Sequence, residues 1–380
     1  MLRRTLLAVG ALIAMPMAAQ AEDFKIGMVM SLTGANSEVG NAYVMSANAG
    51  IALVNQRGGI GGMQAKLLVC DSRSVEQEAV ICARRLALQD KVNLLLGTGS
   101  SPATIAVLPT VEQAGVPLFV FAAATNIYTP VKKWVFKGIP TSDDQLPTVM
   151  DFLKGKKWTK AAMIRDNGPY GADTANAVKM YAAKAGIEII ADEVYSPSDT
   201  DMTAQITRIR GLKPDAILNM AIIPPAGAIV TRTVAQLGMD TPVFVGLNMQ
   251  SDGFVQLVGD ASKLLYFVGS KVVLADTSAD DPLRDNIAAF RKAYTETNPG
   301  QKLTSLSPAA VDGMLLAQAA AKNLGSKALD ANALLAALDG LKSEKGLQGV
   351  WTLSPTDHAS DLRAGMTLVR NEGGSWVAAR

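Results

Sequence analysis

Short apolar runs alternate with longer helical stretches along most of this 380-residue chain. Most of the runs are apolar throughout, which is typical of strands covered by helices on both faces. This alternating order predicts parallel sheets, and therefore an α/β fold. The predicted strands span 25–30, 66–70, 92–96, 117–121, 161–165, 187–195, 215–220, 243–245 and 265–268.

The strand series is too long for one compact sheet, and it is interrupted near the middle of the chain by 137–141, Lys-Gly-Ile-Pro-Thr. The length also favours two domains, at ~100–200 residues each. We therefore predict two doubly wound parallel-sheet lobes. For the tail we predict helices at 308–324 and 331–341, followed by short antiparallel strands at 349–353, 366–370 and 376–378.

Residues 1–21 have the composition of a signal peptide. Arg3 and Arg4 are followed by an apolar stretch at 5–14 and by the small residues Ala19 and Ala21. A short membrane anchor is the alternative, but the stretch is well below the ~20 residues that span a bilayer. Cleavage after Ala21 and a periplasmic location are therefore predicted.

The charge balance excludes several classes of partner. The chain has 36 Lys and Arg against 34 Asp and Glu, and removing Arg3 and Arg4 leaves a neutral mature protein. A neutral chain argues against nucleic-acid binding and against charge-driven membrane binding. The 49% hydrophobic content excludes disorder.

The two cysteines lie in one predicted βα unit, Cys70 at a strand end and Cys82 in the helical pattern 76–88. Export leads to a compartment where disulfides persist. A helix that packs back on its strand can bring two Cα atoms within the ~4.4–6.8 Å that a bridge needs. A Cys70–Cys82 disulfide is predicted, with two buried free thiols as the alternative.

Two turns in the first half are candidates for ligand binding, because parallel sheets bind ligands beyond the carboxyl ends of their strands. In the turn 97–102, Ser101 precedes Pro102, which predicts Ser101 as a helix N-cap. Its backbone donors and the hydroxyls of Ser100 and Ser101 suit a carboxylate; plain capping without a ligand is the alternative. In the turn 122–126, three alanines allow close approach and Thr125 adds a hydroxyl.

In the second half, Tyr170 follows the strand 161–165 within a glycine-rich turn, where it can cover an apolar ligand or simply pack. The sequence contains no G-x-S-x-G, G-x-x-x-x-G-K-[ST] or H-E-x-x-H motif, so it has no such catalytic or phosphate-binding signature. With His358 as the single histidine, the sequence predicts no enzyme, metal site or cofactor. His358 is expected in a solvated loop, and the aspartate pairs 143–144 and 280–281 at helix starts or in loops.

Several strings resemble the leucine/isoleucine/valine-type periplasmic binding proteins, the type I solute receptors of ABC importers. The resemblance covers nearly the whole mature chain, and its most specific string is Asn-Gln-Arg-Gly-Gly-Ile-Gly-Gly at 55–62. The remaining strings are Lys-Ile-Gly at 25–27, Ser-Leu-Thr-Gly at 31–34 and the segments 97–102, 122–125, 166–171 and 214–217.

The resemblance implies a Venus-flytrap fold with three crossing segments between its lobes. Carried over, lobe 1 spans 22–140 plus 270–350, and lobe 2 spans 141–269 plus 351–380. The crossings fall near 139–141, 269–271 and 349–351.

The resemblance also implies roles for single residues. Ser101, with its neighbour Ser100, matches the serine that holds the ligand carboxylate. Ala123 and Thr125 match the contacts of the next turn, and Tyr170 matches the aromatic residue of the second lobe. Val39 falls near the position that sets side-chain specificity.

Two positions depart from the family pattern. Amino-acid receptors have a glutamate for the ligand ammonium where this chain has Asn248, and a tyrosine is replaced by Ile222 or Ile223. Either another carboxylate, such as Asp252 or Asp312, takes over the ammonium, or the ligand has no amino group. In the second case an aromatic or branched acid would occupy an apolar slot formed by Val39, Phe121, Tyr170, Ile222, Ile223 and Met249.

The implied function is capture of a small carboxylate-bearing solute and its delivery to an ABC transporter permease in the inner membrane, by a monomer. An amino-free acid is slightly favoured over a hydrophobic amino acid, and an amide or another polar solute is the remaining option. The alternative function is a periplasmic sensor subunit of the same fold that reports the ligand to a signalling partner.

Overall fold

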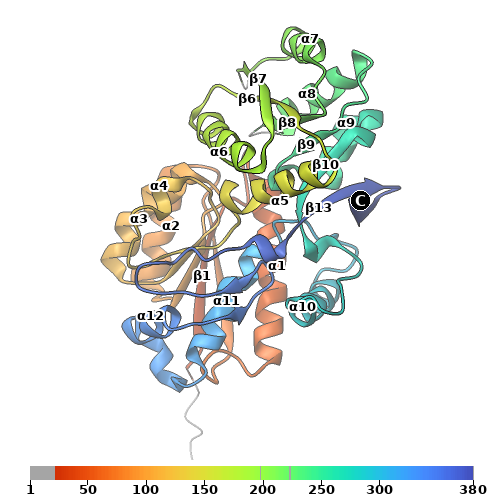
Figure 1. Cartoon of the computed structure of the whole chain (residues 1–380). Helices are drawn as coiled ribbons and strands as arrows, with labels where there is room; N and C mark the ends of the chain where they lie inside the picture. The colour runs from red at the N-terminus through yellow and green to blue at the C-terminus, as the bar shows by residue number, and fades with distance from the viewer. Residues whose placement is uncertain (1–21, 197, 222–223, 380) are drawn as a thin grey trace, which may run out of the picture.

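The computed structural model describes residues 22–196, 198–221 and 224–379. The predicted signal peptide and both isoleucines, Ile222 and Ile223, lie outside the described residues. Figure 1 shows two lobes, one carrying α1–α4 and α10–α12 and the other carrying α5–α9, connected by several crossing segments. Among the described residues, no helix is long and apolar enough to cross a membrane.

The first lobe is built on a parallel sheet in the order β2-β1-β3-β4-β5. Its strands are β1 (Phe24–Met30), β2 (Ala65–Asp71), β3 (Leu94–Gly97), β4 (Leu118–Val120) and β5 (Val135–Lys137). Its helices are α1 (Ser37–Gln56), α2 (Glu76–Arg84), α3 (Ser101–Ala114), α4 (Thr125–Tyr128), α10 (Arg284–Thr297), α11 (Ala309–Ala321) and α12 (Ala331–Asp339). A small antiparallel pair is formed by β11 (Glu344–Lys345) and β12 (Val350–Trp351).

The second lobe has a seven-stranded sheet in the order β14-β13-β10-β9-β8-β6-β7. The run from β7 to β10 is parallel, whereas β13 and β14 are antiparallel. Its strands are β6 (Lys160–Asp166), β7 (Glu188–Tyr195), β8 (Ala216–Met220), β9 (Val243–Val245), β10 (Leu265–Ser270), β13 (Met366–Glu372) and β14 (Ser375–Ala378). Its helices are α5 (Ser142–Gly155), α6 (Pro169–Ala185), α7 (Thr203–Leu212), α8 (Pro224–Gln236) and α9 (Asp252–Val258).

The doubly wound α/β prediction is confirmed, and each predicted strand of the alternating series is present within a few residues. Strand β5 was not predicted, because three residues between lysines give too short an apolar run. In the tail, the antiparallel strands β13 and β14 are as predicted, but β12 pairs with β11 and joins neither large sheet.

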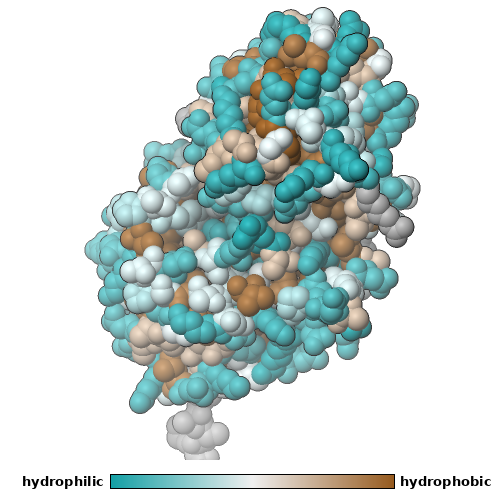
Figure 2. Space-filling view, in the orientation of Figure 1, coloured by the Kyte–Doolittle hydropathy of each residue, from teal (hydrophilic) through white to brown (hydrophobic). Residues whose placement is uncertain are grey.

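The apolar strands are buried because helices cover both faces of each sheet. In the first lobe one continuous core includes Ile26, Leu95 and Phe119, each at most 1% exposed. In the second lobe two separate cores pack on opposite faces of the sheet, around Phe267 and Phe244. Figure 2 shows a mixed outer surface, with the apolar residues of this face mostly scattered among hydrophilic ones.

The predicted disulfide is confirmed. Cys70 at the end of β2 and Cys82 in α2 are bonded, with Cα atoms 5.6 Å apart. The bridge fixes α2 against the strand that precedes it.

The third crossing lies later than the predicted 349–351. Trp351, Leu353 and Leu362 are fully buried in the first lobe's core, and the second lobe begins again at β13. We therefore propose lobe boundaries of 22–140 plus 270–365 and 141–269 plus 366–380. The reason for the shift is that the loop after β12 returns across the first lobe before it crosses.

The expectation of a solvated His358 is wrong. The residue is 4% exposed, and its ring stacks on Phe136 at 4.1 Å between ring centroids. Nε2 lies 2.9 Å from the Asp339 carboxylate, and Nδ1 lies 3.0 Å from the Val135 carbonyl. These contacts attach the loop around His358 to the first lobe. The prediction failed because the turn-rich sequence around His358 gives no sign that this loop folds back onto β5.

Candidate functional site

The turn after β3 requires glycine at its start. Gly97 has φ +139°, and a Cβ there would lie 2.3 Å from the Val29 carbonyl. The chain then enters α3, whose N-cap is Ser100; the Ser100 hydroxyl accepts a hydrogen bond from the Ala103 amide at 3.3 Å. The prediction of Ser101 as N-cap is therefore wrong by one residue.

The reason for the shift is the tolerance of a first helical turn for proline. Because the first four amides of a helix have no intrahelical acceptor, proline fits at the second position as well as at the first. Pro102 takes the second position, and Ser101 becomes the first helical residue. The Ser101 hydroxyl is thereby directed to the neighbouring turn, where it accepts a hydrogen bond from the Ala124 amide at 3.4 Å.

Two hydrogen bonds hold the turn after β4 in place. The Tyr128 hydroxyl donates to the Ala122 carbonyl, and the Phe121 amide donates to the Gly97 carbonyl at 2.9 Å. Ala123 is half-buried and Thr125 is exposed at the start of α4. The structure thus brings Ser100, Ser101, Ala123 and Thr125 together at one edge of the first sheet, and their role in ligand binding stays a prediction.

The loop between β1 and α1 is held by Asp71. Its carboxylate accepts hydrogen bonds from the Leu32 amide at 2.8 Å and the Thr33 hydroxyl at 2.7 Å. Val39 follows on the first turn of α1 and is 36% exposed. An exposed apolar side chain at this loop is compatible with the predicted specificity role, which stays a prediction.

In the second lobe, Tyr170 begins α6 beside Asp166. The Asp166 carboxylate accepts a hydrogen bond from the Gly168 amide at 2.8 Å, and a Cβ on Gly171 would lie 2.1 Å from the Asp166 carbonyl. Burial raises the pKa of the Tyr170 hydroxyl; a hydrogen bond with Thr174 lowers it, and the Asp166 and Asp173 carboxylates raise it. Tyr170 therefore remains a neutral phenol at physiological pH, able to donate a hydrogen bond.

Asn248 is exposed on a 3₁₀ turn, Leu247–Met249, that follows β9. Its side-chain amide donates to the Ala221 carbonyl at 3.5 Å. Met249, on the same turn, is fully buried in the second lobe's core. Phe121 is also buried, stacked on Tyr43 at 4.9 Å. These two side chains lie beneath the surface, so their part in an apolar slot stays a prediction.

The two lobes meet near these turns. The Thr125 hydroxyl donates to the Asp173 carboxylate of α6 at 3.5 Å. A cavity of about 200 Å³ adjoins this contact and is lined by Ala123, Thr125, Thr141, Ser142, Asp143, Asp173, Asn176, Ala177 and Met180. Asp173 was not predicted, although its position three residues after Tyr170 places both on one helix face.

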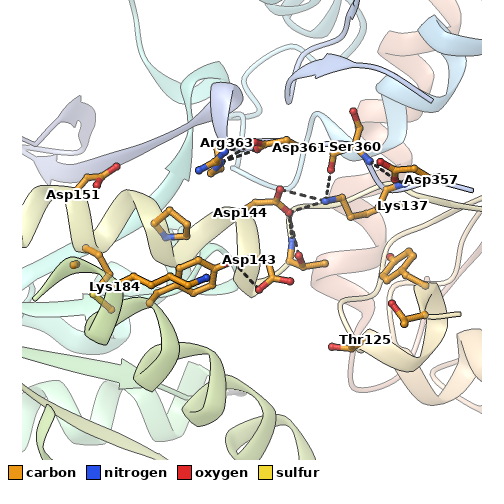
Figure 3. Close-up of a pocket in the computed structure, with 18 of the residues that line it drawn as sticks. Thr125, Lys137, Asp143, Asp144, Asp151, Lys184, Asp357, Ser360, Asp361 and Arg363 are labelled. Atoms are coloured by element: carbon orange, nitrogen blue, oxygen red, sulfur yellow. Dashed lines mark hydrogen bonds and ion pairs between the residues drawn. The ribbon is translucent and has the colours of Figure 1, made fainter. Parts of the chain in front are cut away.

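A larger cavity of about 770 Å³ lies beside the crossing segments (Figure 3). It is lined by both lobes, including Lys137 from β5, Lys154 from α5 and Lys184 from α6, and also by several aspartates. Mixed charges of this kind do not select one sign of ligand. The cavity shares Thr125 with the smaller one, so the two cavities border the same stretch of the lobe contact.

Both carboxylates considered as substitutes for the missing glutamate already have partners in this structure. Asp312 is fully buried, and it accepts hydrogen bonds from Leu347, Gln348 and Trp351. Its pKa is raised to about 6, because the effect of burial outweighs the lowering by these hydrogen bonds. Asp252 forms an ion pair with Lys302 at 2.6 Å. Asp173, by contrast, contacts a predicted ligand-binding residue, Thr125.

Chemically, this edge offers hydroxyls and amides at the start of a 14-residue helix, facing a second lobe with a neutral tyrosine and an asparagine. Helix N-termini favour anions, because their free amides and dipole are positive. In the part of the chain that the structure describes, no cluster of three or more His, Cys, Asp or Glu side chains can hold a metal.

A family model described as periplasmic binding protein matches residues 23–375. The Leu/Ile/Val-binding protein BraC3 of Rhizobium johnstonii is 26% identical over 362 residues, which cover 94% of each chain. An amino acid binding protein of Pseudomonas aeruginosa is 28% identical over 213 residues, so the match spans 55% of this chain and only 57% of that relative.

A solved structure of LivJ from Streptococcus pneumoniae, a branched-chain amino acid transporter substrate binding protein in complex with isoleucine, has a TM-score of 0.77 to this chain. The identity is 23%, and the match covers 94% of this chain and 99% of that one. At this identity the likeness shows the fold alone.

Proposed function

The chain belongs to the periplasmic binding protein family, and from this premise we propose that it captures a small carboxylate-bearing solute between its lobes and delivers it to an ABC transporter permease. The family implies an exported, periplasmic protein. Cleavage after Ala21 and the monomeric state remain predictions.

The observation that carries the proposal is the pair of hydrogen-bonded turns on the first lobe. The Ser101 hydroxyl and the Ala124 amide join the start of α3 to the start of α4, so their donors form one rigid surface. Preorganised donors of this kind hold an anion without first being ordered. We propose that Ser101 and Thr125 bind the ligand carboxylate, with Ser100 capping α3 beneath them.

The second lobe would complete the site by a hinge motion. Tyr170 and Asn248 lie at the starts of elements that follow β6 and β9, on the edge of the second sheet that faces the first lobe. A ligand selects the closed form only through contacts that the open form lacks. In this mechanism Tyr170 and Asn248 supply those contacts, and no covalent chemistry is needed.

For the ligand class, we propose an amino-free aromatic or branched carboxylic acid. Asn248 is neutral, and Asp312 and Asp252 are already engaged. An ammonium enclosed without an anionic partner costs several kcal/mol, which disfavours an amino acid if no other carboxylate reaches it.

A hydrophobic amino acid is the second candidate, and Asp173 is the observation that favours it. This exposed carboxylate contacts the Thr125 hydroxyl, so an ammonium beside Thr125 would meet an anion. The names of the Leu/Ile/Val-binding relatives point in the same direction.

Thermal unfolding of the ligand-stripped mature protein separates these candidates. One panel contains L-leucine, L-isoleucine, L-valine and L-phenylalanine, and the other contains the matching amino-free acids. A ligand at ~1,000 times its dissociation constant adds about 4 kcal/mol to stability, which is a large shift in melting temperature. We expect the shift with the amino-free panel. A shift with amino acids alone would reject that ligand class, and no shift with either panel would reject both candidates.

A further inference from the structure

The first turn of α5 connects several parts of the molecule at the hinge. The Asp143 carboxylate accepts a hydrogen bond from the Tyr181 hydroxyl of α6 at 3.1 Å. The next residue, Asp144, is buried; it accepts from Lys137 Nζ of the first lobe at 3.0 Å and from the Leu362 amide at 2.9 Å. Figure 3 shows Asp143 and Asp144 directed to these different partners.

The third residue of this series, Gln145, connects the first crossing segment to the predicted ligand site. Its Nε2 donates to the Pro140 carbonyl at 3.3 Å, and its Oε1 accepts from the Leu247 amide at 3.1 Å. Leu247 begins the 3₁₀ turn that carries Asn248. One side chain therefore contacts both the segment where the lobes hinge and the turn that presents Asn248.

Only a side chain with a donor and an acceptor can make both bonds, and the amide of glutamine has them. Pro140 lies just before Thr141, the residue that caps α5. A rotation of the lobes about 138–141 changes the direction of the Pro140 carbonyl relative to α5, and so the geometry of its bond to Gln145. The bond to Leu247 passes that change to the turn with Asn248.

We propose that Gln145 is a positioning residue that couples the angle between the lobes to the Asn248 turn, and thereby tunes ligand affinity. The inference rests on the proposed function in one respect, that the ligand meets Asn248. It does not depend on whether the ligand carries an amino group.

Two substitutions separate the two bonds of Gln145. Gln145→Leu removes both. Gln145→Glu keeps an acceptor for the Leu247 amide, but it has no N–H for the Pro140 carbonyl and places a negative charge beside it. The matched control is Asp143→Leu, which breaks the Tyr181 contact on the same turn of α5 and leaves the bonds of Gln145 in place.

The first two measurements need no ligand. Hydrogen exchange reports the protection of the amides at 247–249. Spin labels on Ile105→Cys and Leu212→Cys, two exposed positions on α3 and α7, report the distance between lobes. The native cysteines do not interfere with labelling, because they are bridged to each other.

We expect about tenfold faster exchange at 247–249 in Gln145→Leu and near wild-type exchange in Gln145→Glu, since one hydrogen bond contributes about that factor. Both variants should shift or broaden the interspin distance distribution, and Asp143→Leu should do neither. Unchanged exchange in Gln145→Leu, or equal effects in Asp143→Leu, would overturn the proposal.

Calorimetric titration with L-leucine and with 4-methylpentanoate then tests affinity. For whichever probe binds the wild type, we expect about tenfold weaker binding to Gln145→Leu. Equal affinity of Gln145→Leu and the wild type would overturn the link to the ligand. If neither probe binds the wild type, the proposed function is at fault, whereas the exchange and distance measurements still decide the role of Gln145.

Discussion

Two junctions between the lobes differ sharply in burial. At the hinge, Lys137 and Asp144 form an ion pair whose side chains are 6% and 4% exposed. At the second junction, Lys302 from the loop after α10 pairs with Asp252 of α9, and these side chains are 61% and 35% exposed. We call the first pair the hinge pair and the second the outer pair.

The difference matches the different tasks of the two junctions. Lys137 also donates to the Ser360 carbonyl, and Asp144 also accepts from Leu362, so the hinge pair joins the first and third crossings with its polar groups satisfied. The outer pair is largely open to solvent, and its Lys302 also donates to the Gly374 carbonyl. In the hinge motion proposed above, a buried, fully bonded pair would hold the axis, whereas an exposed pair can form and break at little cost.

The largest effect is expected from breaking the hinge pair. Lys137→Met leaves the Asp144 carboxylate buried without its cation, which should lower the free energy of unfolding by about 3–5 kcal/mol. The same substitution in the outer pair, Lys302→Met, should cost about 0–1 kcal/mol. Urea denaturation of both variants measures the two losses, and similar losses would refute the comparison.

A second buried carboxylate at the hinge predicts a pH dependence. Gln348 Nε2 lies 3.3 Å from the Asp312 carboxylate and also donates to the Gly138 carbonyl, which links Asp312 to the first crossing. The pKa of Asp312 is raised from 3.8 to about 6 by burial. Because the folded state holds this proton more tightly than the unfolded state, stability should fall as pH rises from about 4 to about 6.

The expected change over that interval is about 3 kcal/mol, at 1.36 kcal/mol per pKa unit. Denaturation at pH 4, 5, 6 and 7 measures it. Asp312→Asn cannot titrate, so the variant should be less stable at pH 4 but lack this pH-dependent loss. If Asp312→Asn kept the wild-type dependence of stability on pH, the titration would belong to another group.

Substitutions at the proposed ligand site should affect ligand affinity more than the stability of the fold. Ser101→Ala removes a hydroxyl from the proposed carboxylate site and should weaken ligand binding about tenfold, the effect of one hydrogen bond of ~1.4 kcal/mol. Tyr170→Ala should weaken binding by at least as much, through the contact made on closure. Calorimetry with the ligand found in the thermal panels tests both, and wild-type affinity in both variants would reject the site.

The smallest expected effect, that of Asp173→Asn, helps to identify the class of the ligand. Asp173→Asn removes the negative charge beside Thr125 in an exposed position, so we expect a change of about threefold in affinity. Binding should improve if the ligand is an amino-free acid and weaken if it carries an ammonium. An unchanged affinity for both classes would show that Asp173 does not face the ligand.

The order of elements and the positions of the two candidate binding turns followed from local signals. Continuous apolar runs identified the strands, and Gly, Ser and Pro at 97–102 located the start of α3. The N-cap was displaced by one residue, because proline is tolerated at either of two positions. Strand β5 was too short to have a pattern of its own.

Local sequence signals could not predict the contacts that join distant segments of the chain. Nothing near His358 indicates that it lies on Phe136, because 222 residues separate the two along the chain and neither local pattern depends on the other. Asp173 was within reach of the sequence, since helical spacing from Tyr170 placed it on the same face, but its contact with Thr125 depends on how the lobes meet.

The sequence by itself determined the α/β class, the Cys70–Cys82 bridge and the two turns of the first lobe, since each depends on residues within one βα unit or on a repeated pattern. Only the tertiary structure decided which carboxylates are engaged, where the third crossing lies and what Gln145 joins. Those features depend on burial and on pairs of groups brought together by folding, and neither is encoded in the spacing of residues along the chain.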